Sequence, residues 1–141
     1  RLVLTPHPGE LARLLSSSVS EVQSDRVSSS ARFASRTRTV VLKGAGTVVC
    51  GEGRCLINTS GTPALATAGS GDVLAGMVGA FLARRLSSFE AGSLATYLHG
   101  LAGEAAAEDF TELGVTAEDL PAYIPVAMRR LMKARPTRRR R

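Results

Sequence analysis

The chain has 141 residues, of which 44% are hydrophobic and 21% charged, a composition typical of one soluble globular domain. No apolar stretch is long enough to span a bilayer and the opening residues do not resemble a signal peptide, so we expect a cytoplasmic protein with no membrane partner. The net charge of +6 comes from eight Lys and Arg residues in 129–141, so we predict a basic, disordered tail over 133–141 and no specific nucleic-acid partner.

The first part of the chain predicts a strand, a helix and a polar segment. LVLT, residues 2–5, is a short apolar strand, and the Pro and Gly of PHPGELARLL, residues 6–15, mark a turn into a helix. Residues 16–38 are rich in Ser, with apolar residues at mixed spacings. They predict one exposed, weakly amphipathic helix, and a flexible linker is the alternative.

A further strand and a hairpin follow. TVVLKG, residues 39–44, is rich in β-branched residues and predicts a strand, and residues 46–58 predict a hairpin. Cys50 and Cys55 flank its turn. We expect these two cysteines to be reduced, with a disulfide across the turn as the alternative, and without a neighbouring His they cannot complete a zinc site.

The rest of the chain predicts a loop and three helices. Residues 58–71 form a loop of small residues, and 72–85 are apolar nearly all round, which predicts a buried helix. A second helix covers 87–110, capped by Ser87 or Ser88, and the last begins near Thr116 and ends near Pro136. Strands that alternate with helices before a helical C-terminal third indicate a layered α/β domain.

The sequence TAGSGDVLAG, residues 67–76, suggests an anion hole. A helix begins with unpaired N–H groups and partial positive charge, and residues without bulky side chains let a phosphate approach them. The loop is neither a Walker motif nor a dinucleotide fingerprint. The candidate residues for the anion hole are Ala68, Gly69, Ser70 and Gly71.

Asp72 follows this loop and permits two interpretations. As a helix cap it would stabilise the helix by about 1 kcal/mol. As a general base it would take the proton from a hydroxyl that attacks a phosphate held by the loop, which accelerates such reactions by ~10²–10⁴. The local sequence does not separate the two.

Two other turns are candidate binding segments. KGAGT, residues 43–47, follows a strand, where open α/β sheets bind ligands, and an ordinary turn is the alternative. In TPHPGE, residues 5–10, two prolines hold His7 at the end of a strand. His99 lies within an apolar helix and is interpreted as a core histidine or one that supports the site.

Several segments together resemble the nucleotide-dependent NAD(P)H-hydrate dehydratases of the ribokinase-like superfamily. The resemblance covers residues 2 to about 131, except the Ser-rich segment, and TPHPGE with TAGSGDVLAG is its specific part. The matching segments, in chain order, are LTPHPGELARLL, VVLKGAGTVV, NTSGTPALATAGSGDVLAG, YLHGLAGE and GVTAEDL.

The resemblance implies a ribokinase-like α/β/α sandwich that repairs hydrated NADH or NADPH. A phosphoryl group passes from ADP, or from ATP, to the ring hydroxyl, and loss of phosphate restores the dinucleotide. Asp72 would be the catalytic base, and His7 and Asp72 would contact the hydrated substrate. Mg²⁺ would accompany the nucleotide through ligands that the sequence does not identify, and the chain would form a homo-oligomer, as bacterial relatives form tetramers. The residues implied in adenine-nucleotide binding are Lys43, Gly44, Ala45, Gly46, Thr47 and Gly71.

Two departures from the family pattern accompany the resemblance. Thr62 stands where many relatives have Asn, and the family's upstream strands and helices are absent from residues 1–132, which correspond to the C-terminal part of the domain. We therefore expect the 141 residues alone to be inactive or weakly active. The alternative functions are a ribokinase-like kinase of a vitamin precursor, which has no reason to keep TPHPGE, and an inactive nucleotide-binding module.

Overall fold

The computed structural model describes residues 2–134, which fall into two compact units. Of the described residues, the first unit holds 2–59 and 74–97. The second holds 60–73 and 98–134. The His7 and Lys43 segments therefore belong to the first unit, and Asp72 with the residues before it belongs to the second.

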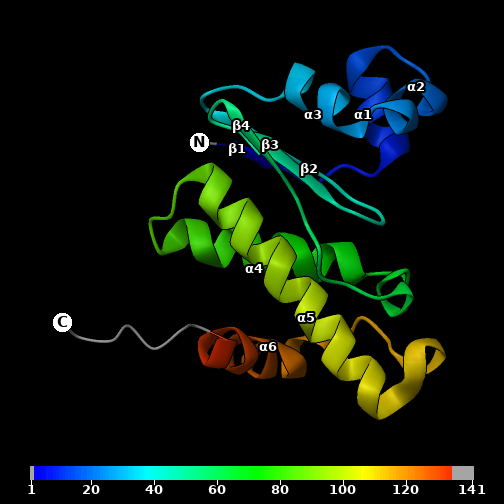
Figure 1. Cartoon of the computed structure of the whole chain (residues 1–141), viewed down its shortest axis with the longest axis vertical. Coiled ribbons are helices and arrows are strands. Elements are labelled where there is room, and N and C mark those ends of the chain that lie inside the picture. The colour runs from blue at the N-terminus through cyan, green and yellow to red at the C-terminus, as the bar shows by residue number, and fades with distance from the viewer. Residues whose placement is uncertain (1, 135–141) are drawn as a thin grey trace. The chain divides into compact units, whose positions relative to one another are not determined.

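A four-stranded mixed sheet forms the centre of the first unit (Figure 1). The strands lie in chain order, with β1 parallel to β2 and the two following pairs antiparallel. Because β1 and β2 are parallel, the turns that follow them lie at the same edge of the sheet. The strands are β1 (Leu2–Leu4), β2 (Arg38–Leu42), β3 (Val48–Gly51) and β4 (Arg54–Ile57).

Helices cover both faces of this sheet. On one face, α1 (Pro8–Leu15) and α2 (Val19–Ser24) bury apolar side chains against the strands, with α3 (Arg26–Phe33) alongside. On the other face, Gly92 of α5 (Ser88–Gly114) lies so close that an added Cβ would be 3.1 Å from the Val41 side chain. Successive strand side chains point to opposite faces of the sheet and so pack against the helices on both sides. The core between the sheet and α1 and α2 contains Leu11, Ala12, Val22, Val40, Leu42, Val48 and Cys50.

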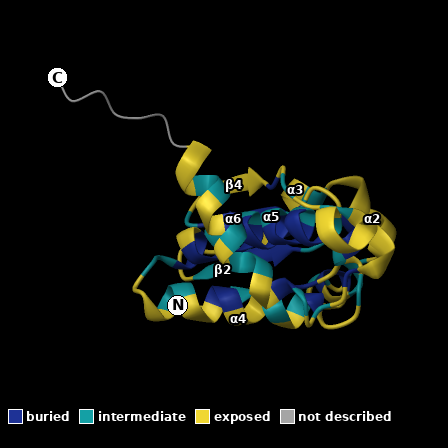
Figure 2. Ribbon diagram, turned by 90° about the horizontal axis from the view of Figure 1, so that it is seen from below, coloured by how far each residue is buried: buried dark blue, intermediate teal, exposed yellow. Residues whose placement is uncertain are grey.

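The Ser-rich segment forms two short helices, so the expectation of one exposed helix or a linker is wrong. Asp25 ends α2 and caps α3, because its carboxylate accepts a hydrogen bond from the Ser28 N–H at 2.9 Å. Most of α2 is exposed (Figure 2), but Val22 is fully buried in the core. The burial of Val22 therefore holds the segment on the sheet, and the Asp25 cap sets the boundary between its two helices.

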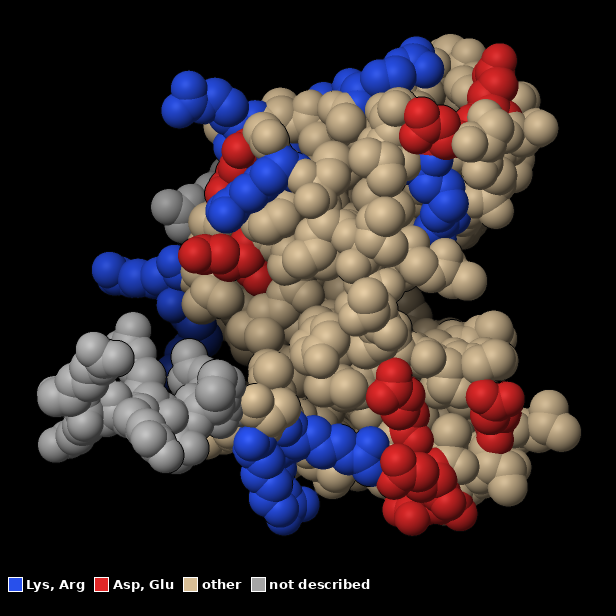
Figure 3. All heavy atoms as spheres, viewed as in Figure 1, with Lys and Arg blue, Asp and Glu red and all other residues tan. Residues whose placement is uncertain are grey.

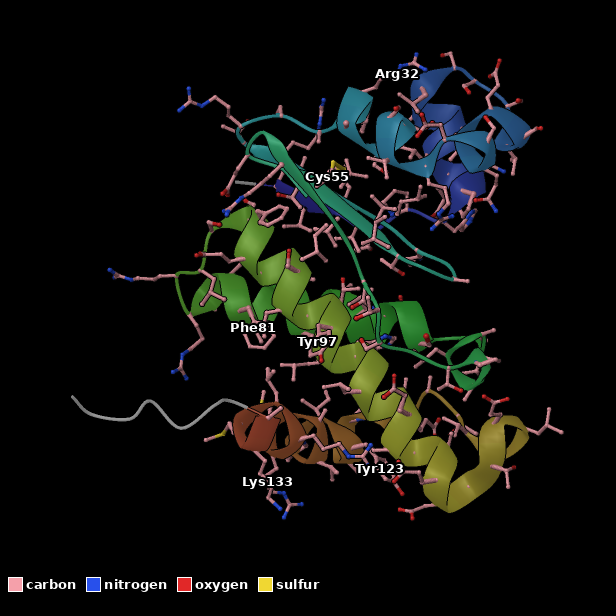
Figure 4. All side chains as sticks on the ribbon, in the orientation of Figure 1. Arg32, Cys55, Phe81, Tyr97, Tyr123 and Lys133 are labelled. Carbon is pink, nitrogen blue, oxygen red and sulfur yellow. A yellow bond between two sulfur atoms is a disulfide. The ribbon has the colours of Figure 1, made fainter. Side chains whose placement is uncertain are left out.

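The hairpin of β3 and β4 carries a disulfide between Cys50 and Cys55, where we expected reduced thiols (Figure 4). The strand register places the two residues directly opposite each other, so their side chains lie on the same face. Cys50 is buried, whereas Cys55 is exposed at the edge strand. The pairing follows from the register, which residue types alone do not reveal.

Helix α4 (Ser70–Ala83) is only partly buried, contrary to the expectation from its apolar composition. Leu74, Met77 and Val78 are buried, while Gly76 and Gly79 are exposed with no atom of the described residues within 4 Å of an added Cβ. Exposed Ala and Gly present little apolar surface to water, which explains how an apolar sequence tolerates this position.

The second unit contains a 3₁₀ turn, η1 (Pro63–Leu65), the C-terminal half of α5 and helix α6 (Leu120–Ala134). Its core joins Ala64, Ala106, Val115 and Leu120. The last helix begins at Leu120, because Thr116 instead donates hydrogen bonds from its N–H and hydroxyl to the Asp119 carboxylate in a preceding turn. Lys133 and Ala134, placed in the predicted tail, are helical, and the remainder of that tail lies outside the described residues.

Candidate active site

The TPHPGE segment starts helix α1 and uses His7 as its N-cap. The His7 Nδ1 atom accepts hydrogen bonds from the Gly9 and Glu10 N–H groups, at 3.1 and 3.2 Å. In return, the His7 N–H donates to the Glu10 carboxylate at 2.6 Å. With Nδ1 accepting, the neutral ring carries its proton on Nε2, and the side chain is 54% exposed. His7 therefore offers a fixed ring with a donor on its outer nitrogen.

The KGAGT segment turns the chain from β2 into β3 beside His7. The Lys43 N–H donates to the Pro6 carbonyl at 2.8 Å, which ties the two segments together. The Thr47 hydroxyl donates to the Gly44 carbonyl at 2.9 Å and closes the turn. Gly44 and Gly46 have φ values of +132° and +63°, so the backbone of this turn requires glycine or strains any other residue.

Lys43 and His7 both lie near the carboxylate of Glu10, the second member of the α1 capping box. Its Nζ atom lies 4.0 Å from the Glu10 carboxylate, while the His7 Nε2 atom lies 3.5 Å from the other Glu10 oxygen. All three side chains are partly exposed, so these contacts orient the groups more than they stabilise the fold. The first unit thus brings together the predicted residues His7 and Lys43.

The predicted anion hole lies in the second unit, where the loop meets α4. Gly69 has a φ of +87° and accepts from the Asp72 N–H at 2.9 Å, while the Ser70 hydroxyl donates to the Leu65 carbonyl at 2.8 Å. The N–H groups of Gly69 and Gly71 donate to no acceptor in the described part of the chain. This geometry presents two N–H groups at the positive end of a helix, which suits an anion.

Asp72 is the third residue of α4 and does not cap it. The helix begins two residues earlier, at Ser70, and among residues 2–134 the Asp72 carboxylate accepts no hydrogen bond. The side chain is exposed, directly after the residues of the candidate anion hole. Of the two interpretations of Asp72, this geometry disfavours the cap.

The loop before Asp72 is supported by α5 through residues whose roles the sequence analysis did not recognise. An added Cβ on Gly103 would lie 2.6 Å from the Leu65 side chain, and one on Gly100 would overlap Ser60. The Glu104 carboxylate accepts from the Gly61 N–H at 2.7 Å. Two glycines three residues apart within a helix are the sequence signal that could have revealed this close approach. Thr62 also binds α5, donating from its hydroxyl to Glu112 at 2.6 Å.

His99 supports the same loop from the same helix. Its ring is buried and its Nε2 atom lies 3.0 Å from the Ser70 carbonyl oxygen. Burial, which disfavours the charged ring, lowers the pKa of His99 more than the hydrogen bond to Ser70 raises it. The neutral ring therefore donates from Nε2, and His99 is a buried histidine that contacts the first turn of α4.

No group of three or more His, Cys, Asp or Glu side chains is placed to hold a metal ion within residues 2–134. Mg²⁺ that arrives with a nucleotide is bound largely by phosphate oxygens and water, so a protein cage is not required.

Charged side chains of both signs are scattered over the face in Figure 3. No described helix has the length and apolar character to cross a membrane.

Comparison with known proteins identifies the family. The protein-family model for NAD(P)H-hydrate dehydratase matches residues 1–126. The chain belongs to this family. It is 47% identical over 131 residues to the bifunctional NAD(P)H-hydrate repair enzyme of Thermofilum pendens, covering 92% of the chain and 25% of that protein. It is 43% identical to the ADP-dependent (S)-NAD(P)H-hydrate dehydratase of Neisseria meningitidis, covering 91% of the chain and 43% of that protein.

A solved structure of the family has the same fold. The ADP/ATP-dependent NAD(P)H-hydrate dehydratase of Bacillus subtilis, co-crystallised with ATP and Mg²⁺ and soaked with CoA, matches with a TM-score of 0.83 at 32% identity. The match covers 91% of this chain and 48% of that one. The chain therefore spans less than half the length of these three family members, and the expected ribokinase-like α/β fold is confirmed over this part.

Proposed function

We propose that this protein takes part in the nucleotide-dependent dehydration of hydrated NADH or NADPH, with ADP or ATP as the phosphoryl donor. Membership of the dehydratase family supports the reaction class, and the names of relatives that use ADP or ATP support the donor. The observation on which the proposal rests is Asp72, an exposed carboxylate without a hydrogen-bonding partner among the described residues, directly after the free N–H groups of Gly69 and Gly71.

Asp72 acts as the general base in this proposal. It takes the proton from the ring hydroxyl as the hydroxyl oxygen bonds to the terminal phosphorus of the nucleotide and the bond from that phosphorus to the leaving nucleotide breaks. The N–H groups of Gly69 and Gly71, with Ala68 and Ser70 shaping the loop, stabilise the charge on the transferred group. Cleavage of the carbon–oxygen bond then releases phosphate, and loss of a proton from the neighbouring ring carbon to water restores the ring double bond of the dinucleotide.

The residues of the first unit bind and orient in this proposal. Lys43 attracts nucleotide phosphate, and the turn from Gly44 to Thr47 lets the nucleotide approach the backbone closely. His7 donates from Nε2 to the hydrated dinucleotide, in the orientation that its Nδ1 cap bonds impose. Glu10 holds both His7 and Lys43 in place.

The direct test supplies hydrated NADH with ADP and Mg²⁺ and follows the return of NADH absorbance. We expect recovery only with nucleotide present, weak when the 141 residues are assayed alone, with one phosphate released for each NADH formed. A parallel reaction with ATP identifies the preferred donor, and a reaction without nucleotide is the control. Phosphate release without NADH recovery would instead indicate an unrelated hydrolase and would contradict the proposal.

A further inference from the structure

Arg26 connects the Ser-rich segment to the turn that follows β2. Its Nη2 atom donates hydrogen bonds to the carbonyl oxygens of Leu42, at 3.1 Å, and Lys43, at 3.2 Å. Its Nη1 atom donates to the Gln23 side chain at 2.6 Å, which holds the guanidinium from the other side. Gln23 and Arg26 belong to the Ser-rich segment, whereas Leu42 ends β2 and Lys43 follows it.

The guanidinium also lies directly against the backbone of Gly44. An added Cβ on Gly44 would be 3.3 Å from Nη2 and 3.4 Å from Nη1 of Arg26. Gly44 has a φ of +132°, a conformation that other residues rarely adopt. The turn therefore packs closely on Arg26, in a backbone conformation that the dihedral angle restricts to glycine.

Helix stability does not account for an arginine at this position. Arg26 is the first residue of α3, where a cation opposes the partial positive charge of the helix N-terminus. Its Nε atom is buried without a hydrogen-bond partner, and no acidic side chain of the described residues forms an ion pair with it. The two charge-assisted hydrogen bonds from Arg26 to the carbonyls of Leu42 and Lys43 offset the unfavourable helix position and the unpaired Nε atom.

We propose that Arg26 is a positioning residue that holds the turn from Lys43 to Thr47 in the conformation that binds the adenine nucleotide. The proposal rests on the function proposed above for this turn. Without the guanidinium, the carbonyls of Leu42 and Lys43 lose their side-chain partner and the peptide groups that follow can rotate. The Ser-rich segment then supports the binding turn through Arg26, in addition to burying Val22 in the core.

Two substitutions and a matched control test this role in the full chain. Arg26→Met removes the donors and keeps the length, and Arg26→Lys keeps the charge but not the planar fork of donors. Arg32→Met is the control, because Arg32 is on the same helix, exposed and labelled in Figure 4. Removal of one positive charge from α3 is common to both methionine variants.

The first measurement is amide hydrogen exchange at the two ends of the turn. The Lys43 N–H is bonded to the Pro6 carbonyl and the Asn58 N–H to the Thr47 carbonyl. We expect exchange of both to accelerate at least about tenfold in Arg26→Met, with the amides of α5 unchanged. Arg26→Lys should give a smaller acceleration and Arg32→Met none. Equal protection in Arg26→Met and the unsubstituted chain would overturn the proposal.

The second measurement is calorimetric binding of ADP with Mg²⁺. We expect at least about tenfold weaker binding in Arg26→Met, partial recovery in Arg26→Lys, and unchanged binding in Arg32→Met. The same loss of ADP affinity in Arg32→Met would show that removal of a positive charge from α3 is enough to weaken binding, and would overturn the positioning role of Arg26. If the unsubstituted chain does not bind ADP, the proposed function fails, and the exchange comparison alone decides whether Arg26 orders the turn. If Arg26→Met does not fold, Arg26→Lys is compared with the control in both measurements.

Discussion

The Nε2 atom of His99 lies 3.0 Å from the carbonyl oxygen of Ser70, and this contact joins the middle of α5 to the first turn of α4. Ser70 directly precedes Gly71 and Asp72, the residues proposed to act on the transferred phosphoryl group. His99 is 7% exposed and donates as a neutral ring. The orientation of the first turn of α4 thus depends on a hydrogen bond from one buried side chain.

His99 should make stability depend on pH. Burial lowers its pKa below the ordinary value of 6.5, so the unfolded chain binds a proton that the folded chain does not. The stability that the neutral, buried His99 contributes is fully present above pH 6.5 and is lost as the pH falls below that value. His99→Gln, whose amide can donate without titrating, should flatten the thermal stability profile between roughly pH 7.5 and 5.5. A profile identical to that of the unsubstituted protein would contradict the role of His99.

Asp72→Asn should separate catalysis from stability. If Asp72 is the base, kcat should fall at least about a hundredfold. The free energy of unfolding should fall by less than about 1 kcal/mol, since the carboxylate only gains from the helix dipole. Steady-state kinetics and urea denaturation measure the two effects. A large loss of stability with an intact kcat would restore the interpretation of Asp72 as a structural residue.

Lys43→Ala should weaken nucleotide binding more than turnover. Loss of a charged phosphate contact should raise the KM for ADP by at least about tenfold, with kcat at saturating ADP changed much less. Glu10→Gln is the companion variant, because it removes the anion 4.0 Å from the Lys43 ammonium and leaves the lysine in place. An unchanged KM in Lys43→Ala would remove Lys43 from the nucleotide site.

Two glycine substitutions in helices should differ in their effect on stability. Gly103→Ala places a Cβ 2.6 Å from Leu65 and should destabilise the fold by about 1–3 kcal/mol. Gly76→Ala meets nothing within 4 Å among the described residues and should be neutral or stabilise by about 0.5–1 kcal/mol. Urea denaturation compares the pair. Equal stability of both variants would show that the loop before Asp72 does not rest on α5.

The disulfide should be detectable by chemistry and by stability. Cys50 and Cys55 should resist alkylation until a reductant is added and then accept two alkyl groups, counted by mass spectrometry. Reduction of the disulfide should lower the free energy of unfolding by about 2 kcal/mol, because the unfolded chain gains entropy when the short loop is no longer closed. Cys55→Ala is the control, because a reductant should then have no effect. Two alkyl groups added without reductant would contradict the pairing.

Local sequence predicted the parts of the site that depend on short-range backbone chemistry. Pro and Gly around His7, the glycines of residues 43–47 and the small residues before Asp72 mark the turns, and β-branched residues mark the strands beside them. These features need only the conformational preferences of neighbouring residues, so one sequence suffices to read them. The family resemblance carried by these motifs is borne out by the family model.

Contacts between residues far apart in the chain were decided only by the tertiary structure. Arg26 reaches the end of β2 sixteen residues away, and His99 reaches Ser70 across twenty-nine. The pairing of Cys50 with Cys55 depends on strand register, and the exposed side of α4 depends on which neighbours cover it. Periodicity and composition report the preferences of a segment, whereas burial, register and hydrogen-bond partners arise when segments pack together.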